Sequence, residues 1–362
     1  MDSFKAKVNQ RKIMWIDSNT LSVSKLNNRY KIAACYLKKV SVNTAFPVEI
    51  VIEITSHCNL SCIMCSRKSS TRTSGYMDFL LFKRIINQVK GYAELVYLSG
   101  GIGEPLMHPD LHDMIEYCVR NDVRVGVSTN ATLLTAKKTD LILKNPPDIL
   151  LLSLDGATKE TVEKIRVGSK FEKTMENVCY FLKEKHKRGA GKPFTIVQMV
   201  YMPENKDEEE LFHRKWKAYK GADDVRFKKF VSFYGAERTP ELAMSFDSQA
   251  NLSCINPYRQ LSIAFDGTVA FCCLDSDFKD PIGNVNSSSI SELWNSKKMV
   301  AYRKLLAEGL KSQVPMCKEC ATIKTSRLTL LGSVFVDDFT IRRILPTVEK
   351  IFLKAGIRLI DY

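Results

Sequence analysis

Long apolar runs are missing from this sequence. Its apolar segments, such as 149–152, fall far short of the ~18 residues that a membrane span needs. The first thirty residues also lack the unbroken apolar core and the small-residue cleavage site of a secretory signal. We therefore expect a soluble protein that lies in the cytoplasm.

Internal repeats and low-complexity tracts are absent as well. The 362 residues are 45% hydrophobic and 26% charged, an ordinary globular balance that allows one large or two modest cores. This balance excludes a disordered or fibrous protein.

Acidic residues are in deficit, with 40 Asp and Glu against 54 Lys and Arg, so the formal net charge is +14. That excess favours acidic partners such as phosphorylated or nucleotide-linked small molecules, or nucleic acid. Basic residues gather at 183–192 and 213–220, but an acidic stretch at 204–210 separates them. We favour solvated helix faces over a polyanion site for these segments.

Short apolar or β-branched segments alternate with amphipathic stretches of helical length between residues 48 and 235. Two of the helices between these segments have predicted N-terminal caps, one at Asp78 and one at Asn205 with Glu208. Successive βα units predict an α/β fold with a parallel sheet, curved into a partial (β/α)6 barrel like that of TIM, whose site lies at the carboxyl ends of the strands. The predicted strands are 48–55, 94–100, 123–129, 149–155, 194–202 and 224–231.

After residue 236 the pattern changes. An Asp-Gly turn at 266–267 joins two short segments, 261–265 and 268–273, in a predicted hairpin, and Ser289 with Glu292 begins a predicted helix to about Gly309. Such a unit is too small to bury much core, and bound metal would supply the missing stability. We thus expect an N-terminal extension (1–47), a barrel (48–236), an auxiliary domain (237–325) and a helical tail (326–362).

Eleven cysteines are many for a reducing compartment, where clustered thiols indicate metal rather than disulfides. Cys58, Cys62 and Cys65 form C-x3-C-x2-C on the loop after the first predicted strand. Three thiolates on one loop can hold three irons of a 4Fe-4S cluster and leave the fourth iron open to another ligand.

On this motif the chain resembles the radical S-adenosylmethionine (radical SAM) superfamily over about residues 48–325. In that family the open iron binds the amino and carboxylate groups of S-adenosylmethionine. One electron from the cluster cleaves the sulfonium, and the 5′-deoxyadenosyl radical takes a hydrogen atom from the substrate. The resemblance implies an external electron donor such as flavodoxin or ferredoxin.

The same resemblance implies a set of residues that contact S-adenosylmethionine at the strand ends. Segment 98–110 looks like the family's glycine-rich motif, although Ile102 interrupts the usual Gly-Gly-Glu, and Ala131 replaces a commoner glycine. The alternative for Arg166 is a surface arginine on a helix. The implied contacts are Gly101, Gly103 and Glu104 to the methionyl amino group, Ser128, Asn130, Ser153 and Asp155 to the ribose and carboxylate, and Arg166 to the carboxylate.

A second cysteine set follows the barrel. Cys254 and Cys272 have the spacing C-x12-G-x4-C, and Cys317 and Cys320 form C-x2-C. This set resembles the shortened auxiliary-cluster ("twitch" or SPASM-like) domain of some radical SAM enzymes. Four thiolates would close a second 4Fe-4S cluster, whose expected role is to pass an electron. A structural cluster or a zinc ion are the alternatives.

The remaining cysteines are expected to be core residues. Cys273 follows Cys272 on a predicted strand, so the two side chains should point to opposite faces, and Cys273 is either packing or a hydrogen-atom donor. His57 beside the first set is predicted to be local packing, and the other single cysteines are Cys35, Cys118 and Cys179.

We therefore predict a radical SAM oxidoreductase that dehydrogenates a sugar or aminocyclitol alcohol, including phosphorylated ones, with the auxiliary cluster as electron acceptor. The alternatives are modification of a ribosomally made peptide, radical epimerisation with a cysteine hydrogen donor, and an iron-sulfur or zinc module that binds nucleic acid. The catalytic base is unknown, and Arg238, Tyr258 and Arg259 are candidates only by position.

Overall fold

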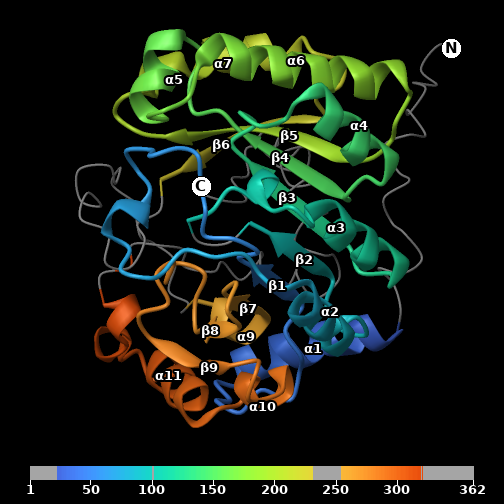
Figure 1. Ribbon diagram of the computed structural model, residues 1–362. Coiled ribbons are helices and arrows are strands. Elements are labelled where there is room, and N and C mark those ends of the chain that lie inside the picture. The colour runs from blue at the N-terminus through green and yellow to red at the C-terminus, as the bar shows by residue number, and fades with distance from the viewer. Residues whose placement is uncertain (1–22, 100–101, 231–253, 319, 321–362) are drawn as a thin grey trace, which may run out of the picture.

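The computed structural model describes residues 23–99, 102–230, 254–318 and 320. Within them one sheet runs through the molecule in the strand order β6-β5-β4-β3-β2-β1-β7-β8-β9 (Figure 1). No helix among these residues is long and apolar enough to cross a membrane.

The first six strands are parallel and follow one another in sequence order, which is the order of a (β/α)6 barrel. The predicted α/β class and all six predicted strands are confirmed. Their bounds are β1 (Glu49–Ile52), β2 (Leu95–Leu98), β3 (Val125–Thr129), β4 (Ile149–Ser153), β5 (Phe194–Tyr201) and β6 (Asp224–Lys229).

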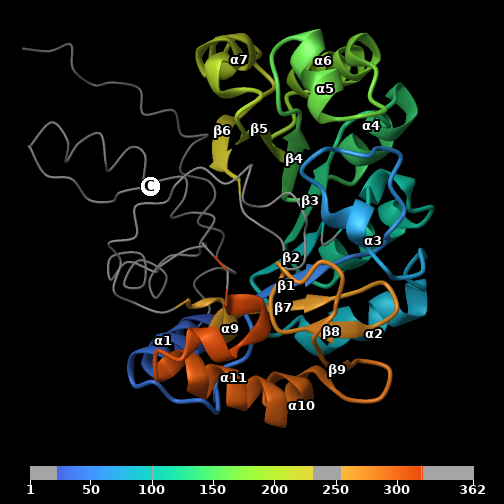
Figure 2. The same ribbon diagram turned by 90° about the vertical axis from the view of Figure 1, so that its left-hand side faces the viewer.

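The connecting helices lie on one side of these strands (Figure 2). The side chains of β1 alternate between the two faces of the sheet, which explains this arrangement. Ile50 and Ile52 are fully buried in the main core beneath the helices. Glu49, Val51 and Glu53 face the opposite way. The helices are α2 (Phe79–Val89), α3 (Leu111–Arg120), α4 (Ala136–Lys144), α5 (Lys159–Ile165), α6 (Phe171–Lys187) and α7 (Glu209–Lys217), with short 3-10 turns η3 (Ser66–Ser69), η4 (Pro105–Met107) and η5 (Lys206–Glu208).

One of the two helix caps predicted for the barrel is confirmed. The Asp78 carboxylate accepts the backbone N–H groups of Leu80 and Leu81 at the start of α2. The predicted pair of Asn205 and Glu208 is wrong as a cap, because both side chains bind elsewhere. Asn205 donates to the carbonyl groups of Asp155 and Val200, and Glu208 accepts from the loop that precedes α5.

The auxiliary region extends the same sheet, because β7 (Gln260–Ile263) pairs in parallel with β1. The predicted hairpin is present: β7 and β8 (Thr268–Ala270) are antiparallel, and Gly267 at the turn has a φ of +87°. The other elements here are α9 (Asn256–Arg259), β9 (Pro281–Asn284), α10 (Ile290–Trp294), α11 (Lys297–Ala307), η6 (Lys311–Gln313) and η7 (Pro315–Cys317).

The single helix predicted from Ser289 is wrong, since the structure has two helices there. Ser289 and Glu292 form the predicted capping box of α10, but the chain turns at Asn295 and Ser296 caps α11. The Asn295 side chain exchanges hydrogen bonds of 2.9 Å with the backbone of Asn43, and this long-range contact breaks the helix.

The N-terminal helix α1 (Val23–Leu37) packs against the auxiliary region. Ile32, Tyr36 and Val48 share a small core with Ile255 and Tyr258, and Trp294 Nε1 donates to the Ala45 carbonyl at 2.8 Å. Residues 23–48 therefore complete the core of the region that follows the barrel. The predicted tail 326–362 lies outside the described residues.

Candidate active site

The loop that carries Cys58, Cys62 and Cys65 begins just after β1, at the carboxyl edge of the sheet. Ser61 and Ile63 donate backbone hydrogen bonds of 2.9 Å to the carbonyl groups of Val167 and Ile165, which follow or end α5. Glu104 N donates to the His57 carbonyl at 2.8 Å. The loop is thus fixed to the end of α5 and to the loop after β2. The His57 ring stacks obliquely on Tyr76, with centroids 4.5 Å apart, in agreement with a packing role.

The three thiols fit ligation to a cluster. All three are free, half-buried cysteines. The backbone N–H of the residue two positions on, Leu60 for Cys58 and Arg67 for Cys65, donates toward the sulfur. Such N–H donors stabilise a thiolate and are typical around iron-sulfur clusters.

Burial raises the pKa of Cys62 to about 11, and the nearby Arg166 guanidinium opposes this rise. Burial likewise raises the pKa values of Cys58 and Cys65. Because iron binds the thiolate, a positive charge beside these sulfurs favours the ligating form. No three His, Cys, Asp or Glu side chains of the described ranges could hold a single metal ion, whereas a cubane cluster takes one thiolate per iron.

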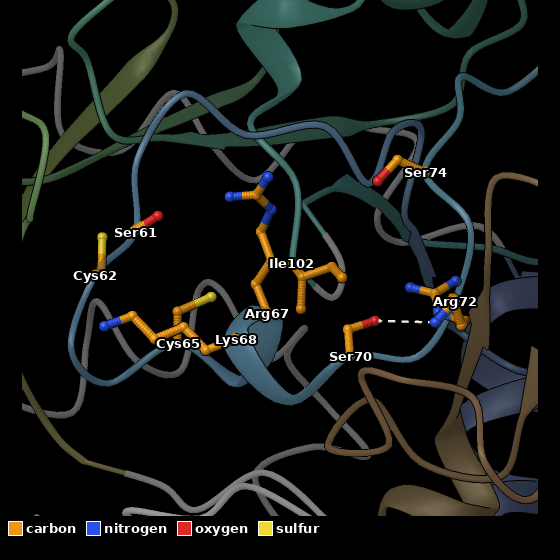
Figure 3. Close-up of a pocket in the computed structure, with 9 residues that line it drawn as sticks. All are labelled: Ser61, Cys62, Cys65, Arg67, Lys68, Ser70, Arg72, Ser74 and Ile102. Atoms are coloured by element: carbon orange, nitrogen blue, oxygen red, sulfur yellow. Dashed lines mark hydrogen bonds between the residues drawn. The ribbon is translucent and has the colours of Figure 1, made fainter.

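An open pocket of about 300 Å³ adjoins two of the cysteines (Figure 3). Its wall is polar and basic, and the basic side chains come from the segment directly after Cys65. The lining residues are Ser61, Cys62, Cys65, Arg67, Lys68, Ser70, Arg72, Ser74 and Ile102.

Glu104 ties together the ends of β2 and β3. Its buried carboxylate accepts from Thr129 Oγ1 at 2.6 Å, Asn130 N at 2.7 Å and Leu106 N at 3.0 Å. Burial raises its pKa, and these hydrogen bonds oppose the rise. One carboxylate oxygen therefore has room for a further donor, which suits the amino contact that the resemblance implies.

Arg166 lies in the site and is not a surface arginine. It is 7% exposed, and its Nη2 donates to Asp155 Oδ2 at 2.6 Å. Burial lowers the pKa of Arg166, but Asp155 and Cys62 outweigh burial and the net shift is upward. Its Nε is buried and has no hydrogen-bond partner in the described part of the chain. An unpartnered guanidinium N–H beside the cysteine loop suits a carboxylate ligand.

The other implied contacts lie along the same edge. Ser128 and Ser153 are half-buried at the ends of β3 and β4. Asn130 bonds Asn59 of the cysteine loop at 3.1 Å, and Ala131 after it has a φ of +62°, the conformation for which glycine is the commoner choice. Gly103 lies against Thr55, whereas Gly101 lies outside the described residues.

The auxiliary cysteines also come together, although they are far apart in sequence. The Cys254 thiol interacts electrostatically with Cys320, Cys273 and Cys317, and Cys272 interacts with Cys254. All are free. The N–H groups of Asn256 and Leu274 donate toward Cys254 and Cys272, as at the first site. This set of four thiols fits a second cluster.

The prediction that Cys272 and Cys273 point to opposite faces is wrong. Strand β8 ends at Ala270, so both cysteines lie in the following turn, where strand alternation does not apply. Their thiols hydrogen-bond each other. Cys273 is therefore a fifth thiol at the auxiliary site.

The remaining candidates lie elsewhere. Cys35 and Cys118 are buried and Cys179 packs against the main core, as predicted. Tyr258 is 2% exposed in the small core with α1, and Arg259 pairs with Glu49 at 3.3 Å, so neither is placed as a base. Arg238 lies outside the described residues.

Sequence reasoning missed Glu53 and Arg72, which form an ion-pair network with Asp277 between the two cysteine regions. Asp277 follows the predicted hairpin and is expected from the sequence only to solvate its end, but it is 6% exposed. Each of the three residues belongs to a different segment, and no local pattern marked the network.

Comparison with known proteins gives both regions an identity. Residues 52–214 match the Radical SAM superfamily, and residues 254–321 match an iron-sulfur cluster-binding domain named SPASM. The two matches together span well over half of the chain.

Two curated relatives are informative. The tungsten-containing aldehyde ferredoxin oxidoreductase cofactor-modifying protein of Pyrococcus furiosus is 33% identical over 43% of this chain, and the match spans 44% of that protein's length. The S-adenosyl-L-methionine-dependent 2-deoxy-scyllo-inosamine dehydrogenase of Niallia circulans is 24% identical over 76% of this chain and 92% of that protein.

Solved structures show the same fold. BtrN in complex with AdoMet and 2-DOIA has a TM-score of 0.53 at 21% identity, over 77% of this chain and 94% of that one. Streptococcus suis SuiB bound to precursor peptide SuiA has a TM-score of 0.55 at 16% identity, over 75% and 70% of the two chains. With its cysteine loop, glycine-rich loop and second cysteine set, the chain belongs to the radical SAM enzymes that carry a C-terminal auxiliary iron-sulfur domain, with S-adenosylmethionine and 4Fe-4S clusters as cofactors.

Proposed function

We propose that this enzyme is an oxidoreductase that dehydrogenates a secondary alcohol of a sugar or aminocyclitol, with the auxiliary cluster as the electron acceptor. Two observations together carry this proposal. The auxiliary thiols lie close to one another, and the relative that aligns over most of both chains is an aminocyclitol dehydrogenase. The domain bounds 48–236 and 237–325 belong to the same proposal.

The cofactors supply, when bound, one electron and a 5′-deoxyadenosyl group that removes a hydrogen atom from a substrate carbon. The alcohol substrate loses two electrons in all. One would leave with the hydrogen atom and end in 5′-deoxyadenosine. A cluster held by Cys254, Cys272, Cys317 and Cys320 would supply the acceptor for the other electron, which would come from the substrate carbon. The O–H proton goes to solvent and a C=O bond forms.

The chain's own residues bind and orient. We assign Cys58, Cys62 and Cys65 to the first cluster and Cys254, Cys272, Cys317 and Cys320 to the second. Glu104 and Arg166 would hold the amino and carboxylate groups of S-adenosylmethionine. Among the described residues, one Glu104 oxygen accepts a single hydrogen bond and the Arg166 Nε has no hydrogen-bond partner. The remaining assigned contacts are Gly101, Gly103, Ser128, Asn130, Ser153 and Asp155.

The inner face of the sheet suits a hydroxylated substrate. Ser153 of β4 is in register with Gln198 of β5, which is in register with Arg226 of β6. These polar side chains alternate with the apolar ones that face the helices. They offer hydrogen-bond donors and acceptors near the carboxyl ends of the strands, where sites of this fold lie.

A compartment that keeps thiols reduced suits the eleven cysteines, and we place the enzyme in the cytoplasm with an external donor such as flavodoxin or ferredoxin. Charge supports an acidic substrate group, since the net charge is +14.

The test is anaerobic turnover of the reduced protein with both clusters loaded. We expect 2-deoxy-scyllo-inosamine, or another aminocyclitol or sugar of a small panel, to raise 5′-deoxyadenosine formation and to yield a ketone in equal amount. Stimulation only by peptide fractions would contradict the proposal in favour of peptide modification. An inverted stereocentre without a ketone would favour epimerisation.

A further inference from the structure

Two segments from opposite halves of the chain meet between the cysteine regions. One is Ser66–Arg72, directly after Cys65, and the other is the turn Asp275–Phe278, which begins two residues after Cys273. The Ser66 and Ser276 hydroxyl groups lie 2.5 Å apart and are buried. The two cysteine regions are therefore in direct contact through the residues that follow them.

Asp277 receives most of the hydrogen bonds across this contact. Ser70 Oγ donates to one carboxylate oxygen, and the backbone N–H and hydroxyl of Thr71 donate to the other at 3.3 and 3.2 Å. Asp277 is 6% exposed. A buried carboxylate with three donors from one segment holds that segment in a defined position.

Arg72 completes the contact and extends it to the barrel. Its Nη2 donates to both carboxylate oxygens of Glu53, at 2.9 and 2.8 Å, and to the Ser276 carbonyl at 3.0 Å. Its Nε lies 3.7 Å from Asp277 Oδ1. The guanidinium also lies over the Phe278 ring, 4.7 Å from its centroid.

The third loop of the site joins through Glu53. Its carboxylate is fully buried just beyond the end of β1 and accepts from the backbone N–H of Ile102 at 3.4 Å. Arg72 is therefore linked to three segments. It continues the first cysteine loop in sequence, contacts the auxiliary turn at Ser276 and Asp277, and is connected to the glycine-rich loop through the Glu53 carboxylate. Figure 3 shows it at the edge of the pocket beside Ser70, whose hydroxyl accepts from Arg72 N.

We infer that Arg72 is a positioning residue for the reaction. It fixes the auxiliary cysteines relative to the first cysteine loop and the glycine-rich loop, so that an electron leaving the substrate reaches the auxiliary cluster. This inference rests on the proposed function for the electron's destination, but the contact itself does not. Nη2 of Arg72 makes the hydrogen bonds to Glu53 and Ser276, whereas Nε and Nη1 are buried and have no hydrogen-bond partner in the described residues. The rigid guanidinium holds Nη2 at Glu53 and Ser276 while Nε faces Asp277, and a lysine has only one ammonium nitrogen to offer.

The test compares Arg72→Gln, Arg72→Lys and Asp277→Asn with a matched control, Arg29→Gln. Arg29 is also buried, pairs with Glu94, and has one buried nitrogen without a hydrogen-bond partner in the described part of the chain, but it lies on α1. The first readout is the magnetic interaction between the two reduced clusters, measured by electron paramagnetic resonance relaxation in protein with full iron and no substrate. The second is the ratio of 5′-deoxyadenosine to oxidised product.

We expect Arg72→Gln to change the relaxation and to raise the ratio by about tenfold or more, because a displacement of 1 Å can cost ~10²-fold in rate. Arg72→Lys should lie between the wild type and Arg72→Gln, and Arg29→Gln should match the wild type in both readouts. Asp277→Asn keeps the side-chain size, so it tests the same contact with the same two readouts if Arg72→Gln does not fold.

Unchanged relaxation and ratio in the folded Arg72 and Asp277 variants would overturn the inference. An equal change in Arg29→Gln would also overturn it, since general destabilisation would then explain the effect. The relaxation arm needs no substrate, so it tests the contact even where no alcohol is oxidised and the proposed function fails.

Discussion

Two single residues at the site carry buried charges that pair with each other. Arg166 and Asp155 are 8% and 0% exposed in their side chains and lie 2.6 Å apart. Asp155 also accepts from Val200 N at 2.8 Å and has a φ of +59°, which asparagine tolerates well. An asparagine at this position therefore removes the charge without adding backbone strain.

We predict that Asp155→Asn lowers the free energy of unfolding by about 3–5 kcal/mol, because it leaves the Arg166 charge buried without its partner. Thermal unfolding at equal cluster loading measures this. The control is Glu116→Gln, which removes an exposed pair with Arg120 and should change stability by less than about 1 kcal/mol. Equal losses in the two variants would refute the explanation by burial.

The vicinal thiols Cys272 and Cys273 give a second prediction at this scale. Only Cys272 has the spacing of the auxiliary motif, but the two thiols share one turn. We expect Cys272→Ser to lose about half of the bound iron and Cys273→Ser to keep all of it, because each cluster holds four irons. Iron and sulfide content per chain measures this, and full iron in Cys272→Ser would show that Cys273 can replace it.

Among the elements, the glycine-rich loop depends on a close approach to the segment that follows β1. A Cβ at Gly103 would lie 1.7 Å from the Thr55 carbonyl oxygen, so the loop must move away from this segment in any variant with a side chain there. That movement would displace Glu104, whose carboxylate holds the end of β3.

We predict that Gly103→Ala weakens S-adenosylmethionine binding at least about tenfold and destabilises the fold by about 1–3 kcal/mol, the usual cost of overpacking. Equilibrium binding to the anaerobic protein with its clusters measures the affinity. Gly91→Ala is the matched control, since a Cβ there meets nothing within 4 Å. Wild-type affinity in Gly103→Ala would mean that the loop does not contact the cofactor.

For the whole molecule, the N-terminal residues and the auxiliary region form one body through a buried cation. Arg303 of α11 is fully buried and donates to the Pro257 carbonyl at 2.8 Å, the Asn295 side chain at 3.0 Å and the Ser41 carbonyl at 3.3 Å. Its guanidinium lies over Trp294, 4.3 Å from the ring centroid. Burial lowers the pKa of Arg303 to about 10, so it stays charged at neutral pH.

We predict that Arg303→Leu destabilises the protein by about 2–4 kcal/mol, since it leaves buried acceptors without donors. Because Pro257 is three residues from Cys254, the auxiliary cluster should be lost first on heating. Absorbance of the clusters and circular dichroism, followed together, measure both events. The exposed neighbour Lys304→Gln should behave as the wild type, and loss of both clusters together in Arg303→Leu would contradict the assignment.

The sequence by itself determined the local features. Alternating apolar segments predicted all six parallel strands, Asp78 predicted a helix start, and the spacing of Cys58, Cys62 and Cys65 predicted the first cluster site, because each depends on residues close together in the chain. The second cysteine set is spread over residues 254–320 and was predicted from its resemblance to a known domain. Only the tertiary structure decided that β7 joins β1, that Asn295 breaks a helix, and that Cys272 and Cys273 share a turn. It also decided that Arg72 meets Asp277, 205 positions along the chain. The pairing of β7 with β1, the contact of Asn295 and the ion pair of Arg72 with Asp277 depend on how distant segments pack. No local pattern of residues specifies a partner so far away.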